Sequence, residues 1–132
     1  MNNFSIVVGI KSFSLSHDEK RYFKKFKPLG VILFKRNILN KNQVTSLTKD
    51  IKNILGPHAL IMIDQEGGKV SRLSKEIWPS FPAANIFGKM AEKNIEKAKK
   101  ATYKNFNLIG KELHKIGINF NCTPVLDLFV KN

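Results

Sequence analysis

Two carboxylates, two glycines and an arginine follow a short apolar run in the middle of the chain. The run Ile61-Met62-Ile63 leads into Asp64-Gln65-Glu66-Gly67-Gly68, and Arg72 follows closely. An aspartate can accept hydrogen bonds from hydroxyl groups, and an arginine can donate a planar fork of N–H groups. The two glycines lack the Cβ atoms that would keep a ligand or a neighbouring loop away. The pattern predicts a buried strand that ends in a polar site, where Asp64 and Arg72 bind a hydroxyl-rich ligand.

Four apolar runs must position this site, and each is nearly continuous rather than alternating. Such runs are typical of parallel strands that are covered on both faces. The expected strands are 5–10, 31–34, 60–63 and 118–125. Because helical segments separate them, the fold class is α/β with right-handed parallel crossovers. Two architectures fit this alternation: a doubly wound sheet, or part of an eightfold barrel.

Three helices are expected between the strands, over 16–27, 40–55 and 94–116. The first begins with Ser16 and Glu19 at the spacing of a capping box, and Pro28 stops it. Gly56-Pro57 ends the second helix, and Gly117 caps the third. The segment 74–84 is expected to be a loop, in which Trp78 anchors the chain to the core rather than stacking on a ligand.

The charge balance is strongly basic, with 23 Lys and Arg residues against 10 Asp and Glu residues and a net charge of +13. Only Arg21, Arg36 and Arg72 are arginines, although base readout and phosphate forks favour arginine. The lysines are spread along predicted helix faces without a ladder of aromatic residues between them. We therefore expect no nucleic-acid partner, and a basic nucleic-acid-binding protein is kept only as a third hypothesis.

The apolar runs are all too short to span a membrane, and the first ten residues do not resemble a signal peptide. The single cysteine, Cys122, cannot form an internal disulfide and is interpreted as a small buried hydrophobe. These features predict a soluble, cytoplasmic protein without a membrane partner.

Several other polar residues are interpreted as structural. Glu66 continues into a turn, Asn37 sets a turn after the second strand, and Asp127 supports the loop that follows the fourth strand. The histidines lack the spacing of metal ligands, so no metal site is expected. They are His17, His58 and His114.

Three segments in this order resemble a known family. They are Gly30-Val31-Ile32-Leu33-Phe34-Lys35-Arg36-Asn37, the stretch from Ile63-Asp64-Gln65-Glu66-Gly67-Gly68-Lys69-Val70 to Arg72, and Asn119-Phe120-Asn121-Cys122-Thr123-Pro124-Val125-Leu126-Asp127-Leu128. The chain is similar to the amino-terminal half of glycoside hydrolase family 3 β-N-acetylhexosaminidases of the bacterial peptidoglycan-recycling type. The resemblance covers nearly the whole chain, and the segment D-Q-E-G-G-x-V-x-R is specific to that family.

The resemblance implies a (β/α)₈ barrel that removes terminal β-linked N-acetylglucosamine from muropeptides, by a retaining mechanism without a metal or organic cofactor. An aspartate attacks the anomeric carbon, and a histidine on a mobile loop replaces the second carboxylate as acid/base. Asp64 and Arg72 match sugar-binding residues of the family. This sequence contains neither the G-D-R-S-F segment nor the K-H-F-P-G-H-G segment, and the later nucleophilic aspartate does not occur. No catalytic residue is therefore assigned in this chain.

Residues 1–132 are thus expected to be part of one family 3 amino-terminal domain, either from a truncated gene product or from the start of a longer protein. The first hypothesis is a piece of a glycoside hydrolase with little activity of its own. The second is a non-catalytic sugar-binding module that a partner chain completes by supplying the remaining barrel strands.

Overall fold

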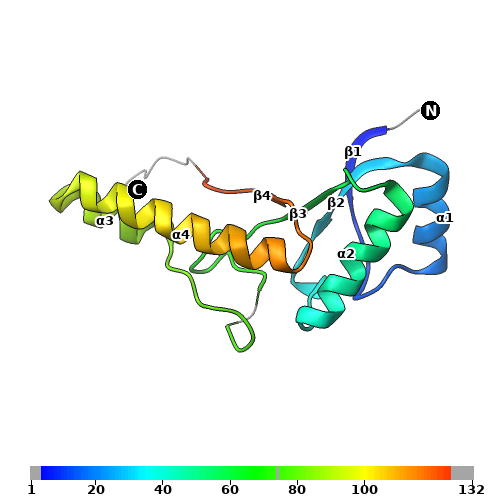
Figure 1. The fold of residues 1–132 in the computed structure, drawn as a ribbon, viewed down its shortest axis with the longest axis horizontal. Coiled ribbons are helices and arrows are strands. Elements are labelled where there is room, and N and C mark those ends of the chain that lie inside the picture. Colours follow the sequence, from blue (N-terminus) through cyan, green and yellow to red (C-terminus); the bar gives the residue numbers. More distant parts are fainter. Residues whose placement is uncertain (1–3, 74, 126–132) are drawn as a thin grey trace, which may run out of the picture.

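A sheet of four parallel strands forms the centre of the protein (Figure 1). The computed structural model describes residues 4–73 and 75–125. The strands are β1 (Phe4–Gly9), β2 (Pro28–Leu33), β3 (Leu60–Ile63) and β4 (Phe120–Asn121), and their order in space follows their order in the sequence. A doubly wound sheet reverses its strand order at a switch point, whereas a barrel adds each strand beside the previous one. The sequential order therefore favours part of a barrel over a doubly wound sheet.

The register of the sheet brings the ends of its strands together. Leu33 pairs with Ile63, and Ile63 pairs with Asn121 on its other side. The residues that follow these positions therefore leave the sheet side by side, at one edge. They are Phe34, Asp64 and Cys122.

Helices α1 (His17–Phe26) and α2 (Lys41–Leu55) follow the first two strands, with a short 3₁₀ turn, η1 (Lys35–Asn37), before α2. The predicted capping box is confirmed, because the Ser16 hydroxyl accepts from the Glu19 N–H and the Glu19 carboxylate accepts from the Ser16 N–H. Lys27 ends α1 in a left-handed conformation, with φ of 44°. The strand after it therefore starts at Pro28, three residues earlier than the apolar run suggested.

One face of the sheet carries the core. Alternate residues of β2 and β3 are completely buried and belong to one apolar cluster with residues of α2. They are Val31, Leu33, Ile61 and Ile63. The residues between them, such as Ile32 and Met62, are only partly buried, and Phe120 is exposed. The prediction that both faces are covered was therefore wrong for the described residues.

Two helices, α3 (Ala84–Lys93) and α4 (Ile95–Lys115), connect β3 to β4. Figure 1 shows them lying side by side and extending away from α1 and α2. The long α4 was predicted, and the Asn94 side chain caps it by accepting from Lys97 N–H. Helix α3 was not predicted from the sequence. Its apolar residues Phe87, Met90 and Ala91 recur at helical spacing, but the helix is short, contains Gly88 and follows a proline-containing loop, which weakens the signal. None of its residues is buried, and it packs chiefly against α4.

The fourth strand is shorter than the apolar run that predicted it. Regular pairing covers only Phe120–Asn121, although 118–125 was expected to be strand. Around this pairing, the backbone N–H groups of Asn119 and Cys122 still donate to Ile61 O and Ile63 O, and asparagine side chains add further hydrogen bonds. Asn119 Oδ1 accepts from Ile61 N–H at 2.7 Å, and its Nδ2 donates to Ala59 O at 2.9 Å. The Asn119 side chain thus performs part of the pairing that a longer strand would provide.

Within the described residues, no helix is long and apolar enough to cross a lipid bilayer.

Candidate functional site

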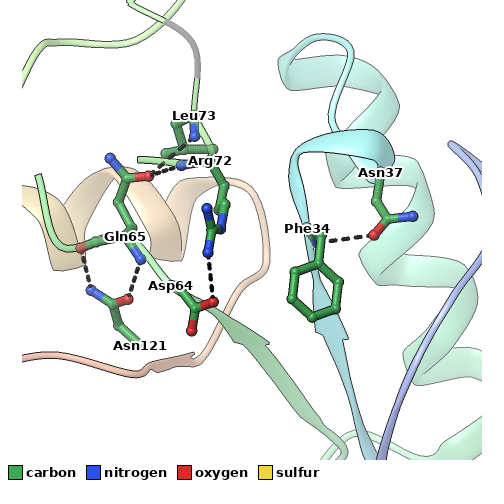
Figure 2. A network of polar contacts seen from close by, with 7 residues as sticks. All are labelled: Phe34, Asn37, Asp64, Gln65, Arg72, Leu73 and Asn121. Carbon is green, nitrogen blue, oxygen red and sulfur yellow. Dashed lines mark hydrogen bonds and ion pairs between the residues drawn. The ribbon is translucent and has the colours of Figure 1, made fainter. Parts of the chain in front are cut away.

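Asp64 and Arg72 meet at the carboxyl end of β3 (Figure 2). Arg72 Nη2 lies 3.0 Å from Asp64 Oδ2, and the two side chains are 28% and 24% exposed. The ion pair is therefore partly withdrawn from solvent and still reachable by a ligand. The sequence predicted both residues for one site, and the structure places them in direct contact.

Gln65 holds the loop that carries Arg72. This residue is completely buried, which is uncommon for a glutamine. Its Oε1 accepts hydrogen bonds from the N–H groups of Arg72 at 2.9 Å and Leu73 at 3.1 Å, and its Nε2 donates to Ser71 Oγ at 2.8 Å. All polar atoms of the amide are used, so the loop backbone is fixed opposite Asp64. This role of Gln65 was not predicted from the sequence.

Asn121 connects the same region to β4. Its Oδ1 accepts from Gln65 N–H, and its Nδ2 donates to Gln65 O, both at 3.0 Å (Figure 2). The asparagine side chain therefore extends the sheet by one step, beyond the last backbone pair. This contact fixes the backbone directly after Asp64 from one side, while the Gln65 side chain fixes the loop from the other.

Gly67 and Gly68 allow a neighbouring loop to approach closely. Their φ values are 96° and 61°, a region that favours glycine. A Cβ on Gly67 would overlap the Pro82 carbonyl oxygen, and a Cβ on Gly68 would overlap Ala83. Glu66 enters this turn through its backbone, because its N–H donates to Val70 O at 2.9 Å. The glycines were expected to admit either a ligand or a neighbouring loop, and the structure shows the loop.

Cys122 lies on the other side of Asp64. Its N–H donates to Ile63 O at 2.9 Å, which places the residue beside Asp64 at the end of the sheet. Burial and the adjacent Asp64 carboxylate, within hydrogen-bonding reach of the thiol, raise the pKa of Cys122 above its ordinary value of 9.0. The thiol is only partly buried, so it is a neutral neighbour of the site rather than the buried hydrophobe that was predicted.

A second polar group lies after β2, at the same edge of the sheet. The buried Asn37 side chain accepts from Phe34 N–H at 2.9 Å and donates to the carbonyls of Ile10 and Ser12, so its predicted turn role is confirmed. Arg36 lies over the Phe34 ring at 4.7 Å and donates to Ile10 O. This cation–π pair was not predicted. The one hint in the sequence was that Arg36 follows the end of a predicted strand.

The remaining residues from the sequence analysis lie away from Asp64. Trp78 is buried, as expected for a loop anchor, and its Nε1 has no hydrogen-bond partner in the part of the chain that is described. His17 is in α1, His58 lies before β3, and His114 is in α4. Residues 4–73 and 75–125 contain no group of three or more potential metal ligands. Asp127 lies outside the described residues.

A sequentially ordered parallel sheet with polar side chains at its carboxyl edge is the arrangement of (β/α)₈-barrel enzymes. Comparison with known families matches residues 5–131 to the glycosyl hydrolase family 3 N-terminal domain. The chain therefore belongs to glycosyl hydrolase family 3.

Curated relatives of the chain include two proteins named beta-hexosaminidase. The protein from Bordetella avium is 32% identical over 123 residues, and the protein from Neisseria gonorrhoeae is 35% identical over 124 residues. Each match covers 93% of this chain but only 35% and 34% of the relatives, so the chain spans about a third of their length.

A solved structure of NagZ from Neisseria gonorrhoeae, in complex with N-trifluoroacetyl-D-glucosamine, has a similar fold. The TM-score is 0.90 at 32% identity, and the match covers 97% of this chain and 38% of that one. The four parallel strands thus correspond to part of a family 3 barrel domain, which confirms the predicted fold class.

Proposed function

We propose that this chain provides part of the substrate site of a β-N-acetylhexosaminidase that removes terminal β-linked N-acetylglucosamine from peptidoglycan fragments. Asp64 and Arg72 bind hydroxyl groups of that sugar in this proposal. The observation that carries it is the partly buried Asp64–Arg72 pair at the carboxyl edge of the sheet, in a chain of family 3. The amino-sugar ligand of the similar NagZ structure supports the choice of sugar.

The chemistry of the pair suits a polyhydroxylated ligand. A carboxylate can accept hydrogen bonds from two adjacent hydroxyls, and a guanidinium donates in a fixed plane. Asn121 fixes the backbone directly after Asp64, and the Gln65 side chain fixes the loop backbone at Arg72. Binding of a ligand therefore has to order little of this region. Arg72 Nε is buried without a hydrogen-bond partner among the described residues, which leaves one donor of the fork unused.

Binding and turnover separate in this proposal. The sequence holds no K-H-F-P-G-H-G segment, which carries the acid/base histidine in the family, and none of its aspartates matches the family nucleophile. We therefore propose that residues 1–132, as part of one family 3 domain, bind the sugar in the cytoplasm without hydrolysing it and without a cofactor.

A chain that supplies further barrel strands is the partner we propose for turnover. The observation that favours it is strand β1, which pairs only with β2 in the described sheet. Its side chains Phe4 and Ile6 are 47% and 50% exposed, so an apolar surface lies beside a free row of backbone groups. Recovery of hydrolysis on mixing this chain with the carboxyl-terminal part of a related enzyme would support this partner, and persistent inactivity would contradict it.

Calorimetric titration with N-acetylglucosamine tests the sugar proposal. Asp64→Asn should weaken binding at least about tenfold, because it removes a charge-assisted acceptor. Asp18→Asn is the matched control, since it makes the same change in an exposed ion pair of α1. Equal affinity of the wild type and Asp64→Asn would contradict the proposal.

Hydrolysis of a chromogenic N-acetylglucosaminide tests the separation of binding from catalysis. The chain should leave this substrate uncleaved, and rapid turnover that Asp64→Ala abolishes would overturn the separation.

A further inference from the structure

Helix α4 carries a row of exposed lysines on the side that faces away from the core. The row consists of Lys97, Lys100, Lys104 and Lys111, and we call it the lysine stripe. At 3.6 residues per turn, these side chains fall within an arc of about 60° and extend along about 21 Å of the helix axis. The buried residues of the helix, such as Ile109, lie on the opposite side. The stripe is therefore open to solvent along α4, which extends away from α1 and α2 (Figure 1).

No carboxylate within residues 4–73 and 75–125 forms an ion pair with the lysine stripe. The two glutamates of α4 pair with other lysines, Glu96 with Lys99 at 2.9 Å and Glu112 with Lys115 at 2.6 Å. Helix α3, which packs against α4, adds two lysines and one glutamate. Like charges one turn apart on a helix repel one another, so the stripe does not stabilise its own helix. An anionic partner surface would offset this repulsion.

Two exposed apolar side chains accompany the lysines and indicate the kind of partner. Leu108 lies one turn from both Lys104 and Lys111 and is 55% exposed, and Tyr103 lies one turn after Lys100 and is 73% exposed. Neither α3 nor α4 contains an arginine, the residue that suits phosphate forks and base readout. A single exposed tyrosine is also no stacking ladder for bases. Lysines beside an exposed leucine and tyrosine are instead suited to the headgroup region of a lipid bilayer.

We propose that the lysine stripe holds this protein on the surface of a lipid bilayer that contains anionic phospholipids, with Leu108 and Tyr103 in the headgroup region. Each lysine near such a surface adds an attraction that salt weakens. The proposal does not rest on the proposed function, because it uses no residue of the loop after β3. It differs from the expectation of no membrane partner, which was based on the short apolar runs and not on the surface of α4.

Sedimentation with lipid vesicles tests this proposal on the 132-residue chain. Vesicles of phosphatidylcholine with about one third phosphatidylglycerol should bind the chain at least about tenfold more tightly than vesicles of phosphatidylcholine alone. This preference should shrink as the NaCl concentration rises, because salt shortens the range of the attraction. Equal binding to the two kinds of vesicle, or no binding to the anionic vesicles, would overturn the proposal.

Two matched variants test whether the stripe, rather than the overall charge, is responsible. Lys100→Gln/Lys104→Gln should weaken binding to the anionic vesicles at least about tenfold, because each lysine contributes about fivefold. Lys20→Gln/Lys24→Gln removes the same charge at the same spacing from exposed positions of α1, and it should weaken binding by less than about threefold. Equal losses in the two variants would overturn the assignment to α4.

The last comparison separates a bilayer from a nucleic acid. Leu108→Gln should weaken binding to the anionic vesicles about threefold, because it removes an apolar group from the headgroup region. An unchanged affinity would contradict the contact of Leu108 with lipid. A double-stranded DNA oligonucleotide should bind more weakly than the anionic vesicles at the same NaCl concentration. Tighter binding to DNA that Lys100→Gln/Lys104→Gln removes would assign the stripe to nucleic acid and overturn the proposal.

Discussion

Two aspartate–arginine ion pairs of nearly equal length occupy different regions of the molecule. Asp18 and Arg21 lie 2.9 Å apart on the surface of α1, and their side chains are 75% and 77% exposed. Asp64 and Arg72 lie 3.0 Å apart at the end of β3, where the exposed fractions are 24% and 28%. The chemical groups and the distance match, so the surroundings must account for any difference in what the two pairs do.

The surroundings differ in what holds each partner. The helix alone brings Asp18 and Arg21 together, because residues three apart lie on the same face. Eight residues separate Asp64 from Arg72, and a loop fixed by Gln65 spans this separation. A pair held by its own scaffold and partly withdrawn from water can offer a pre-organised site to a ligand, whereas an exposed helical pair contributes little. The comparison teaches that the scaffold, rather than the ion pair, distinguishes the candidate site.

Removal of the scaffold should have the largest effect. Gln65→Ala leaves the N–H groups of Arg72 and Leu73 without their buried acceptor and opens a cavity. We expect the free energy of unfolding to fall by about 3 kcal/mol, measured by urea denaturation. Asn42→Ala, on the exposed side of α2, should change it by less than about 0.5 kcal/mol. Similar losses in the two variants would show that Gln65 does not hold the loop.

Double-mutant cycles measure the two ion pairs directly. The cycle of Asp64→Ala and Arg72→Ala should give a coupling energy of about 1 kcal/mol, because partial burial reduces solvent screening. The cycle of Asp18→Ala and Arg21→Ala should give about 0.3 kcal/mol, the range of exposed helical pairs. Chemical denaturation of all variants provides both numbers. Equal coupling in the two cycles would remove the distinction between the regions.

The reactivity of Cys122 reports on the charge at Asp64. Burial and the Asp64 carboxylate hold the pKa of the thiol above its ordinary value, so little thiolate is present at neutral pH. Asp64→Asn should lower that pKa and speed alkylation of Cys122 by iodoacetamide at pH 8. Asp18→Asn, in the other ion pair, should leave the rate unchanged. Mass spectrometry follows both reactions, and an unchanged rate in Asp64→Asn would contradict the proximity of the two groups.

The smallest effect is expected at the start of α1. Burial opposes ionisation of Glu19, but the backbone N–H groups of Ser16 and Lys11 donate to its carboxylate, and the net effect is a lowered pKa. A carboxyl whose pKa is lower in the folded state stabilises the fold above its unfolded value of 4.5 and loses that contribution as the pH falls through the folded value. The difference in unfolding free energy between the wild type and Glu19→Gln should therefore shrink below pH 4.5. A constant difference would contradict this prediction.

Local patterns in the sequence predicted the parts of the fold that depend on neighbouring residues. The capping box of Ser16 and Glu19, the apolar run of β3 and the turn at Asn37 all use contacts within a few residues or a single periodicity. Those signals are visible without knowledge of the tertiary structure, so these elements were predicted correctly.

Features that depend on distant residues could not be predicted in the same way. Asn121 replaces backbone pairing only because β4 lies beside β3, 56 residues away from Gln65. Helix α3 packs chiefly against α4, and its apolar stripe is short and buries no residue completely, so the stripe alone did not mark a helix. The candidate site was only partly predictable from the sequence. Asp64 and Arg72 were identified by residue type and family resemblance, but the role of Gln65 becomes visible only in the folded loop.

The central claim is that Asp64 and Arg72 form a binding site for an amino sugar. Two-dimensional NMR of the ¹⁵N-labelled chain, titrated with N-acetylglucosamine, tests it most directly, because the Arg72 Nε–H group and the Gly67 and Gly68 amides report on that site separately. We predict concentration-dependent shifts of these signals that disappear in Asp64→Asn, while the Arg21 Nε–H signal stays in place. Shifts confined to other parts of the molecule, or no shifts at saturating sugar, would contradict the claim.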